Sequence, residues 1–317
     1  MDDIYFPAVV RLRFVLEARA AISLPPFTGS TWRGLLGTAL RRSVCVPGLE
    51  RCDACLITPF CAFYRFFEQG ALTERQDPRY RSSSPPFVLD LLGDYGRVVQ
   101  PGEPLAVGLN IIGDSIDFIP DWVYAIQCAG TLGVGQGCGR FELVAVLQER
   151  LLGSDSWEPI WQRDAEGIAA IEPQPVAFPE PPPVLDLELL TPLRIKRQSA
   201  LVGEGDLTAA ELLRHLCIRL DRIEQQLGRG GEPCFWPRYR GLVESLPKAQ
   251  ARVHWHDWTR YSSRQQQYMK LGGLVGRLRI PEQAMPGLWP AIWLGQWVHV
   301  GKNTSFGLGA YRVVAPE

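Results

Sequence analysis

The sequence predicts an α+β protein made of two copies of a β-α-β-β-α-β unit. Three observations predict this fold class. Each half of the 317-residue chain opens with a strand pattern, continues into a helix, and ends with a glycine-rich stretch that runs into another strand. Hydrophobic residues make up 46% and charged residues 21%, which is ordinary for a globular protein and excludes a largely disordered one. A chain of this length can bury two separate cores.

The strands and helices are predicted from the spacing of apolar residues. Apolar and polar residues alternate over 10–17 and again over 185–189, as in half-buried strands. A helix is expected to begin near Ser30 and another near Thr208. The second start is a capping box, Thr208 to Glu211, and leucines then recur at helical spacing.

The two glycine-rich stretches occupy matching places at the ends of the halves. One runs from Gly133 to Gly139 and the other from Gly301 to Gly309. Neither fits a nucleotide-binding motif, because Asn303 replaces the Ser or Thr of a P-loop and the first stretch leads into a strand instead of a helix. Two interpretations remain: backbone that approaches a ligand closely, or a pair of tight turns.

Charge and proline content divide the chain in the middle. We predict domains at 1–150 and 184–317, joined by a proline-rich linker at 151–183. From Val184 onward, 18 Lys plus Arg face 12 Asp plus Glu, a balance of +6, whereas the first part holds 15 against 22, a balance of −7. A basic second half suits a polyanionic partner, although arginine enrichment also arises from codon bias. No apolar run reaches the roughly 20 residues of a spanning helix and the amino terminus lacks a secretion signal, so we expect a cytoplasmic protein that does not enter membranes.

Four cysteines form a separate signal in the segment at about 43–65. Cys45, Cys52, Cys55 and Cys61 are spaced as C-x6-C-x2-C-x5-C. A cytoplasmic chain keeps thiols reduced, and four thiolates suit tetrahedral zinc. The sequence therefore predicts a small insertion held by structural zinc, with an iron-sulfur cluster or unligated cysteines as the alternatives.

Several motifs together resemble one known family. The carboxy-terminal segments 271–276 and 299–309, the segment 258–265 and the segment 27–37 with the cysteines after it are similar to CRISPR-associated repeat-processing endoribonucleases of the RAMP superfamily, of the Cas-six type. The resemblance spans nearly the whole chain. It implies tandem ferredoxin-like (RRM-like) domains that bind CRISPR repeat RNA. It also implies cleavage by the neighbouring 2′-hydroxyl, without a catalytic metal, to give a 2′,3′-cyclic phosphate and a 5′-hydroxyl.

The catalytic residues are harder to assign, because a first-domain histidine often serves as the base in this family and this chain has no histidine before His215. His254 and His256 are two residues apart, so on a strand they share a face. Arginine can hold and neutralise phosphate but is a poor proton donor. The predicted catalytic residues are Arg33, Tyr261, Arg264, His299 and Lys302. The predicted RNA-binding residues are Arg41, Arg42, Arg260, Gly301, Asn303, Thr304, Ser305, Gly307 and Gly309. We expect these residues to converge at a cleft between the domains. The simpler alternative is that the charged ones are ordinary surface residues and that Tyr261 is part of the core.

Three hypotheses of function follow. The first is a metal-independent endoribonuclease that matures CRISPR transcripts for antiviral defense. The second is a non-catalytic subunit that holds guide RNA (crRNA) inside an effector complex, which the missing histidine keeps open. A third, a subunit that contacts only proteins, is disfavoured by the basic second half. Other effector-complex subunits and a second copy of the chain are further candidate partners.

Overall fold

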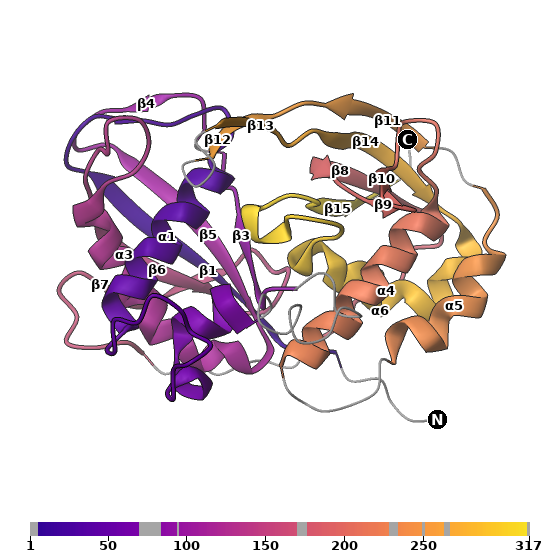
Figure 1. Cartoon of the computed structure of the whole chain (residues 1–317). Helices are drawn as coiled ribbons and strands as arrows, with labels where there is room; N and C mark the ends of the chain where they lie inside the picture. The colour runs from indigo at the N-terminus through magenta and orange to yellow at the C-terminus, as the bar shows by residue number, and fades with distance from the viewer. Residues whose placement is uncertain are drawn as a thin grey trace. The chain divides into compact units, whose positions relative to one another are not determined.

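The computed structural model describes residues 6–69, 84–93, 95–169, 176–227, 234–248, 251–262 and 267–315, with backbone only over 259–262 and 267–270. The chain divides into two compact units. The N-terminal unit comprises residues 7–176, and the C-terminal unit comprises Phe6 and the chain from Ala177 onward. Figure 1 shows the first in indigo and magenta and the second in orange and yellow.

The N-terminal unit is a five-stranded antiparallel sheet with two helices packed on one face (Figure 1). Its strand order is β3-β5-β1-β6-β7. The sheet strands are β1 (Val9–Ala18), β3 (Phe87–Asp90), β5 (Pro104–Ile112), β6 (Phe141–Glu149) and β7 (Trp157–Gln162), the helices are α1 (Gly29–Val44) and α3 (Ile119–Leu132), and a small ribbon pairs β2 (Ile22–Ser23) with β4 (Val98–Val99).

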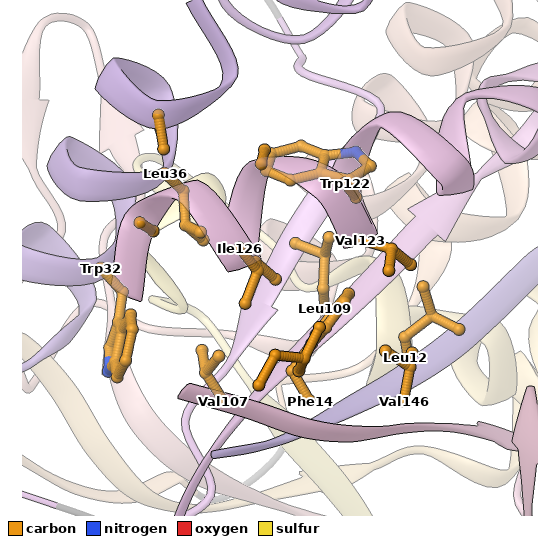
Figure 2. Packing of buried hydrophobic residues seen from close by; sticks show 14 of the residues in the cluster. Leu12, Phe14, Trp32, Leu36, Val107, Leu109, Trp122, Val123, Ile126 and Val146 are labelled. Carbon is orange, nitrogen blue, oxygen red and sulfur yellow. The ribbon is translucent and has the colours of Figure 1, made fainter. Parts of the chain in front are cut away.

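The core of this unit forms where the apolar side of the sheet meets the two helices. Alternation along β1 buries Leu12, Phe14 and Leu16 and turns Arg11 and Arg13 to the other side. Figure 2 shows side chains of α1 and α3 packed with those of the strands; the labelled residues include Trp32, Leu36, Trp122 and Ile126 of the helices and Leu12, Phe14, Val107 and Leu109 of the strands. A continuous apolar cluster of this kind is the main source of the unit's stability.

The C-terminal unit repeats the same chain path. Its four-stranded antiparallel sheet has the order β11-β14-β8-β15. The sheet strands are β8 (Leu185–Leu193), β11 (Ala251–His256), β14 (Gly273–Ile280) and β15 (Tyr311–Val314), the helices are α4 (Ala209–Gln226), α5 (Phe235–Ser245) and α6 (Met285–Val298), and two ribbons pair β9 (Lys196–Arg197) with β10 (Ala200–Leu201) and β12 (Thr259–Ser262) with β13 (Gln267–Lys270).

Both units are ferredoxin-like, as predicted. In each sheet the first strand is central, flanked by the third and the fourth, and the second strand lies beyond the third. The Thr208 half of the predicted capping box is present, because the Thr208 hydroxyl accepts a hydrogen bond from the Glu211 N–H at 3.1 Å at the start of α4. The leucines predicted to line this helix are buried.

The predicted linker at 151–183 differs from the structure in its first part. Residues 157–162 form β7, which pairs with β6 at the edge of the N-terminal sheet. The sequence did not predict this strand because it contains Pro159, and proline interrupts most strands but is tolerated at a sheet edge. Among the described residues, each helix is too short or too polar to cross a membrane.

Candidate functional site

The glycine-rich segment of the C-terminal unit joins α6 to β15 as a closed loop. α6 ends at Val298, and the next residue, His299, has a positive φ of 57° and an N–H that still donates to Gly295 O at 2.9 Å. The N–H of Val300 donates to Gly309 O at 3.0 Å, which ties the two ends of the loop together. The chain then enters β15 at Tyr311.

The loop is held against the end of β8 by backbone and hydroxyl hydrogen bonds. The Lys302 N–H donates to Arg194 O at 2.8 Å. The Thr191 hydroxyl donates to Gly307 O at 2.8 Å and accepts from the Ala310 N–H at 2.9 Å. Because these contacts fix both arms of the loop, its tip is a rigid platform and not a flexible lid.

Two of the predicted RNA-binding glycines are required by the loop itself. A Cβ on Gly301 would lie 2.6 Å from Arg194 O, and one on Gly309 would lie 1.8 Å from Val300 O. Their φ angles of +89° and +71° are also unfavourable for other residues. These glycines therefore let the backbone approach the rest of the protein, which is the tight-turn interpretation of the sequence.

The loop presents only part of its predicted residues to solvent. The Lys302 side chain is exposed and that of Asn303, which has a left-handed φ of 64°, is half-buried. Thr304, Ser305 and Gly307 are buried. Lys302 at the tip is thus the cation of this loop that a phosphate can reach.

His299 is placed to hold the loop. Its side chain is only 3% exposed, and Nδ1 lies 3.2 Å from Leu308 O. A carbonyl can only accept, so Nδ1 carries the proton in this contact. The sequence predicted a catalytic His299, but a ring buried in this way does not face solvent, where a substrate would approach.

Two arginines that sequence reasoning missed, the buried Arg219 and the half-buried Arg194, support the same loop. Arg219 of α4 is 4% exposed and its Nε donates to Val298 O at 2.7 Å, at the C-terminal end of α6, where a cation suits the helix dipole. Burial lowers the pKa of Arg219 to about 9. Arg219 lies three residues after Leu216, so the helical spacing itself marks it as part of the buried stripe of α4.

Arg194 connects the loop to the second glycine motif of this unit. Its Nη1 donates to Gly272 O, while its own carbonyl accepts from Lys302 N–H. Burial lowers the pKa of Arg194. Gly273 is needed beside it because a Cβ there would lie 2.6 Å from Leu193 O. The motifs at 271–276 and 299–309 are therefore parts of one scaffold around the end of β8.

The predicted residues of α1 belong to the N-terminal unit and are largely engaged within it. The Arg33 guanidinium lies 5.1 Å from the Phe67 ring and that of Arg41 lies 5.5 Å from the Phe63 ring. Arg41 also donates to the carbonyls of Leu49 and Glu50 at 2.7 and 2.9 Å. Arg41 therefore stabilises the cysteine-containing segment, a role the sequence did not predict. Arg42 is exposed.

The predicted residues of the segment 258–265 are only partly described. Arg260 and Tyr261 lie in β12, where the structure describes the backbone and not the side chains. Arg264 lies outside the described residues. Their assignment to the site stays a prediction from the sequence.

The four cysteines follow α1 in a segment of turns. Cys45 caps α1, and the N–H of Cys55 donates to Cys52 O at 3.2 Å in a tight turn. Burial raises the pKa of Cys52, and the nearby Glu68, Cys61 and Cys45 raise it further. Within the described residues, which include all four cysteines, no three Cys, His, Asp or Glu side chains are placed to hold a metal ion. A structural zinc ion at these cysteines stays a prediction from the sequence.

Comparisons with known proteins match both parts of the chain. Residues 6–175 match a family model described as the AF_1859 N-terminal domain, and residues 187–311 match the model for the CRISPR-associated endoribonuclease Cas6. An uncharacterized protein of Archaeoglobus fulgidus is 23% identical over 92% of each chain.

Solved structures share the fold at low identity. A Thermus thermophilus Cas6 product complex has a TM-score of 0.55 at 16% identity, covering 98% of this chain and 100% of that one. A partial Cas6-RT-Cas1–Cas2 complex has a TM-score of 0.54 at 14% identity, covering 98% of this chain and 46% of that one. The fold of this chain is thus shared with solved Cas6 proteins.

Proposed function

This chain belongs to the CRISPR-associated Cas6 endoribonucleases through residues 187–311 and to the AF_1859 N-terminal-domain family through residues 6–175, and we propose that it cleaves CRISPR repeat RNA without a catalytic metal. The ribose 2′-oxygen bonds to the adjacent phosphorus and the bond from phosphorus to the 5′-oxygen breaks. A proton leaves the 2′-hydroxyl and another reaches the 5′-oxygen. The products are a 2′,3′-cyclic phosphate and a 5′-hydroxyl.

The observation that carries this proposal is a cation on a rigid loop. The phosphorane gathers negative charge in the transition state, and a fixed cation that meets it lowers the barrier without reorganisation. Lys302 stands at the exposed tip of a loop that Thr191, Arg194 and Arg219 hold in place. Alignment of the 2′-oxygen with the breaking bond would come from binding the repeat on either side of this loop.

The role of His299 in this proposal is positional. With Nδ1 on Leu308 O and its side chain 3% exposed, the ring keeps the loop in shape. Tyr261 and Arg264 remain the proposed proton-transferring and phosphate-binding partners of Lys302, on the strength of the sequence resemblance.

A second candidate function is a subunit that binds guide RNA without cutting it. The absence of histidine before His215 and the burial of His299 favour it, because no exposed imidazole is then available in the positions the family resemblance points to. Repeat specificity and attachment to other CRISPR proteins also belong to this proposal, since solved structures with this fold include a Cas6 product complex and a Cas6-RT-Cas1–Cas2 complex.

Cleavage in the presence of a chelator tests the two functions. We expect end-labelled repeat RNA, taken from the CRISPR array beside this gene, to be cut in EDTA with a cyclic phosphate on the upstream fragment. Tight binding without cutting would support the guide-binding subunit instead.

Replacement of the loop cation tests the site. We expect Lys302→Ala to slow single-turnover cleavage by about a hundredfold, the effect of removing one charge-stabilising donor from an active site. Lys248→Ala is the matched control, because Lys248 is also an exposed lysine of the C-terminal unit. We expect Arg264→Ala to slow single-turnover cleavage as well. Unchanged rates for both Lys302→Ala and Arg264→Ala would remove this site.

A further inference from the structure

Exposed apolar side chains gather in the cysteine-containing segment that follows α1. Among the described residues, half of the large hydrophobic side chains that are exposed lie within 46–60. These five residues, which we call the apolar patch, are Val46 (88% exposed), Leu49 (43%), Leu56 (96%), Ile57 (39%) and Phe60 (86%). Single apolar residues scattered over a surface are normal, but a concentration of this kind marks a place where another molecule binds.

The segment that carries the patch is anchored to the N-terminal unit. Cys52 and Cys61 pack against the hydrophobic core, and Phe63, directly after the segment, is buried. Arg41 donates to two backbone carbonyls of the segment. Because the segment packs on the unit through these residues, the side chains of its apolar patch face solvent.

The charges around the patch cancel. From Arg42 to Phe60 the exposed charged residues are two arginines, Arg42 and Arg51, and two carboxylates, Glu50 and Asp53. Arg51 and Asp53 form an ion pair. A surface with this balance has no net charge to attract the phosphates of RNA or of an anionic membrane. It favours a protein partner, because the cores of protein interfaces are apolar and depleted in charge.

The area of the patch suits a contact between two proteins. A large apolar residue exposes about 150 Å² when it lies fully in water, so the five exposed fractions amount to roughly 500 Å². A stable interface buries about 800 Å² on each partner, with an apolar core and a polar rim. The patch therefore supplies the larger part of such an interface, and the charged residues around it supply a rim.

We propose that the apolar patch is the contact between two copies of this chain. In a symmetric dimer the same surface lies on both sides of the interface, so an excess of one charge would repel itself, whereas here the two signs are equal in number. The whole chain also has a formal net charge of only −1, so two copies do not repel each other at a distance. The patch lies in the N-terminal unit and the Lys302 loop in the C-terminal unit, so this inference does not rest on the proposed function.

Sedimentation velocity of the full chain at increasing concentration tests the dimer. We expect a Kd of about 10 μM, because the area lies near the lower end for stable complexes. Leu56→Ser/Phe60→Ser should raise the Kd at least about hundredfold, since the dimer loses two apolar anchors from each copy. A wild-type chain that is still monomeric at roughly 200 μM, far above the Kd expected for this area, would overturn the proposal.

The matched control removes a similar pair of side chains elsewhere on the N-terminal unit. Tyr124 and Leu151 are 55% and 56% exposed. Tyr124→Ser/Leu151→Ser should leave the Kd unchanged. An equal loss of association in both double variants would mean that apolar surface of any kind drives it, and the patch would not be the interface. Thermal unfolding checks that both double variants fold.

A pair of opposite charges at one position distinguishes a second copy from any other partner. Leu56→Glu and Leu56→Lys each place like charges on the two sides of a symmetric interface, so each variant alone should be monomeric. An equal mixture of the two brings opposite charges together and should associate at least about tenfold more tightly than either variant alone. A mixture as weak as the single variants, or single variants that dimerise like the wild type, would show that the two patches do not face each other. Cleavage of repeat RNA by a monomeric wild-type chain would remove this inference and leave the endoribonuclease proposal standing.

Discussion

The two units share one chain path but differ on the open faces of their sheets. In the N-terminal unit, Arg11 lies 2.9 Å from Glu149 and 3.2 Å from Asp90. Arg19 and Arg163 share the carboxylates of Glu17 and Glu142. The C-terminal face instead aligns Arg252, Arg277 and Arg312 in one row with Glu188, and Asp186 pairs with Arg279 in the next row. A duplicated fold therefore leaves two similar sheets whose open faces differ in how arginines and carboxylates are placed.

The loops that precede β6 and β15 can be compared in the same way. In both, the residue directly after the preceding helix has a positive φ, Gly133 at 79° and His299 at 57°. Both are closed by a backbone hydrogen bond, from Val134 to Gly139 and from Val300 to Gly309. Only the longer C-terminal loop carries a lysine at its tip. The hydrogen-bonded ends that the two loops share are structural. The extra residues of the C-terminal loop include the lysine that carries the proposed chemistry.

Alanine at one packed glycine of the C-terminal loop and at one open glycine of the N-terminal loop should test this comparison most strongly. Gly309→Ala places a Cβ 1.8 Å from Val300 O, whereas Gly137→Ala at φ +86° meets no atom within 4 Å. We expect the first to lower the free energy of unfolding by about 4 kcal/mol and to abolish cleavage. The second should cost about 1 kcal/mol for backbone strain alone. Urea unfolding of both variants measures the difference, and equal costs would contradict the close packing of the C-terminal loop.

The segments that follow the first helix of each unit should also differ in how strongly one side chain stabilises them, with the larger effect again in the C-terminal unit. In the C-terminal unit, the buried carboxylate of Asp221 accepts from the N–H groups of Phe235 at 2.8 Å and Trp236 at 2.9 Å and holds the start of α5. In the N-terminal unit, Arg41 donates to two carbonyls on the surface.

We expect Asp221→Ala to cost about 3 kcal/mol, because it leaves buried N–H groups without an acceptor, and Arg41→Ala about 1 kcal/mol. Urea unfolding measures both. Hydrogen exchange should show faster exchange at the start of α5 in the Asp221 variant and in residues 45–60 in the Arg41 variant. The reverse order of costs would mean that these side chains do not hold the segments as described.

The smallest effect is expected at the four cysteines. A structural zinc ion there stays a prediction from the spacing of the four cysteines. If the ion binds, purified protein contains about one zinc per chain, Cys52→Ser removes it, and chelation affects only the N-terminal unit. Cys138→Ser, at an exposed cysteine outside the segment, is the control. Protein without stoichiometric metal would leave Arg41 as the element that holds this segment.

Much of the fold was predictable because it depends on local patterns. The alternation in β1 and β8 and the capping box at Thr208 are properties of short stretches, and the structure confirms the elements that they predicted. β7 was missed because Pro159 is acceptable only at a sheet edge, and the sequence does not show which strands are edges. Arg219 was missed although its spacing after Leu216 was visible, because an arginine in an apolar stripe is normally assigned to the surface.

The sequence by itself determined the duplicated unit, the positions of the glycine loops and the motifs of the family, because these depend on which residues follow one another. The tertiary structure decided which loop glycines contact the chain itself, that His299 is buried, and that Arg252, Arg277, Glu188 and Arg312 form one row. The physical reason is that strand register and burial bring together residues from distant segments, and no local pattern encodes that pairing.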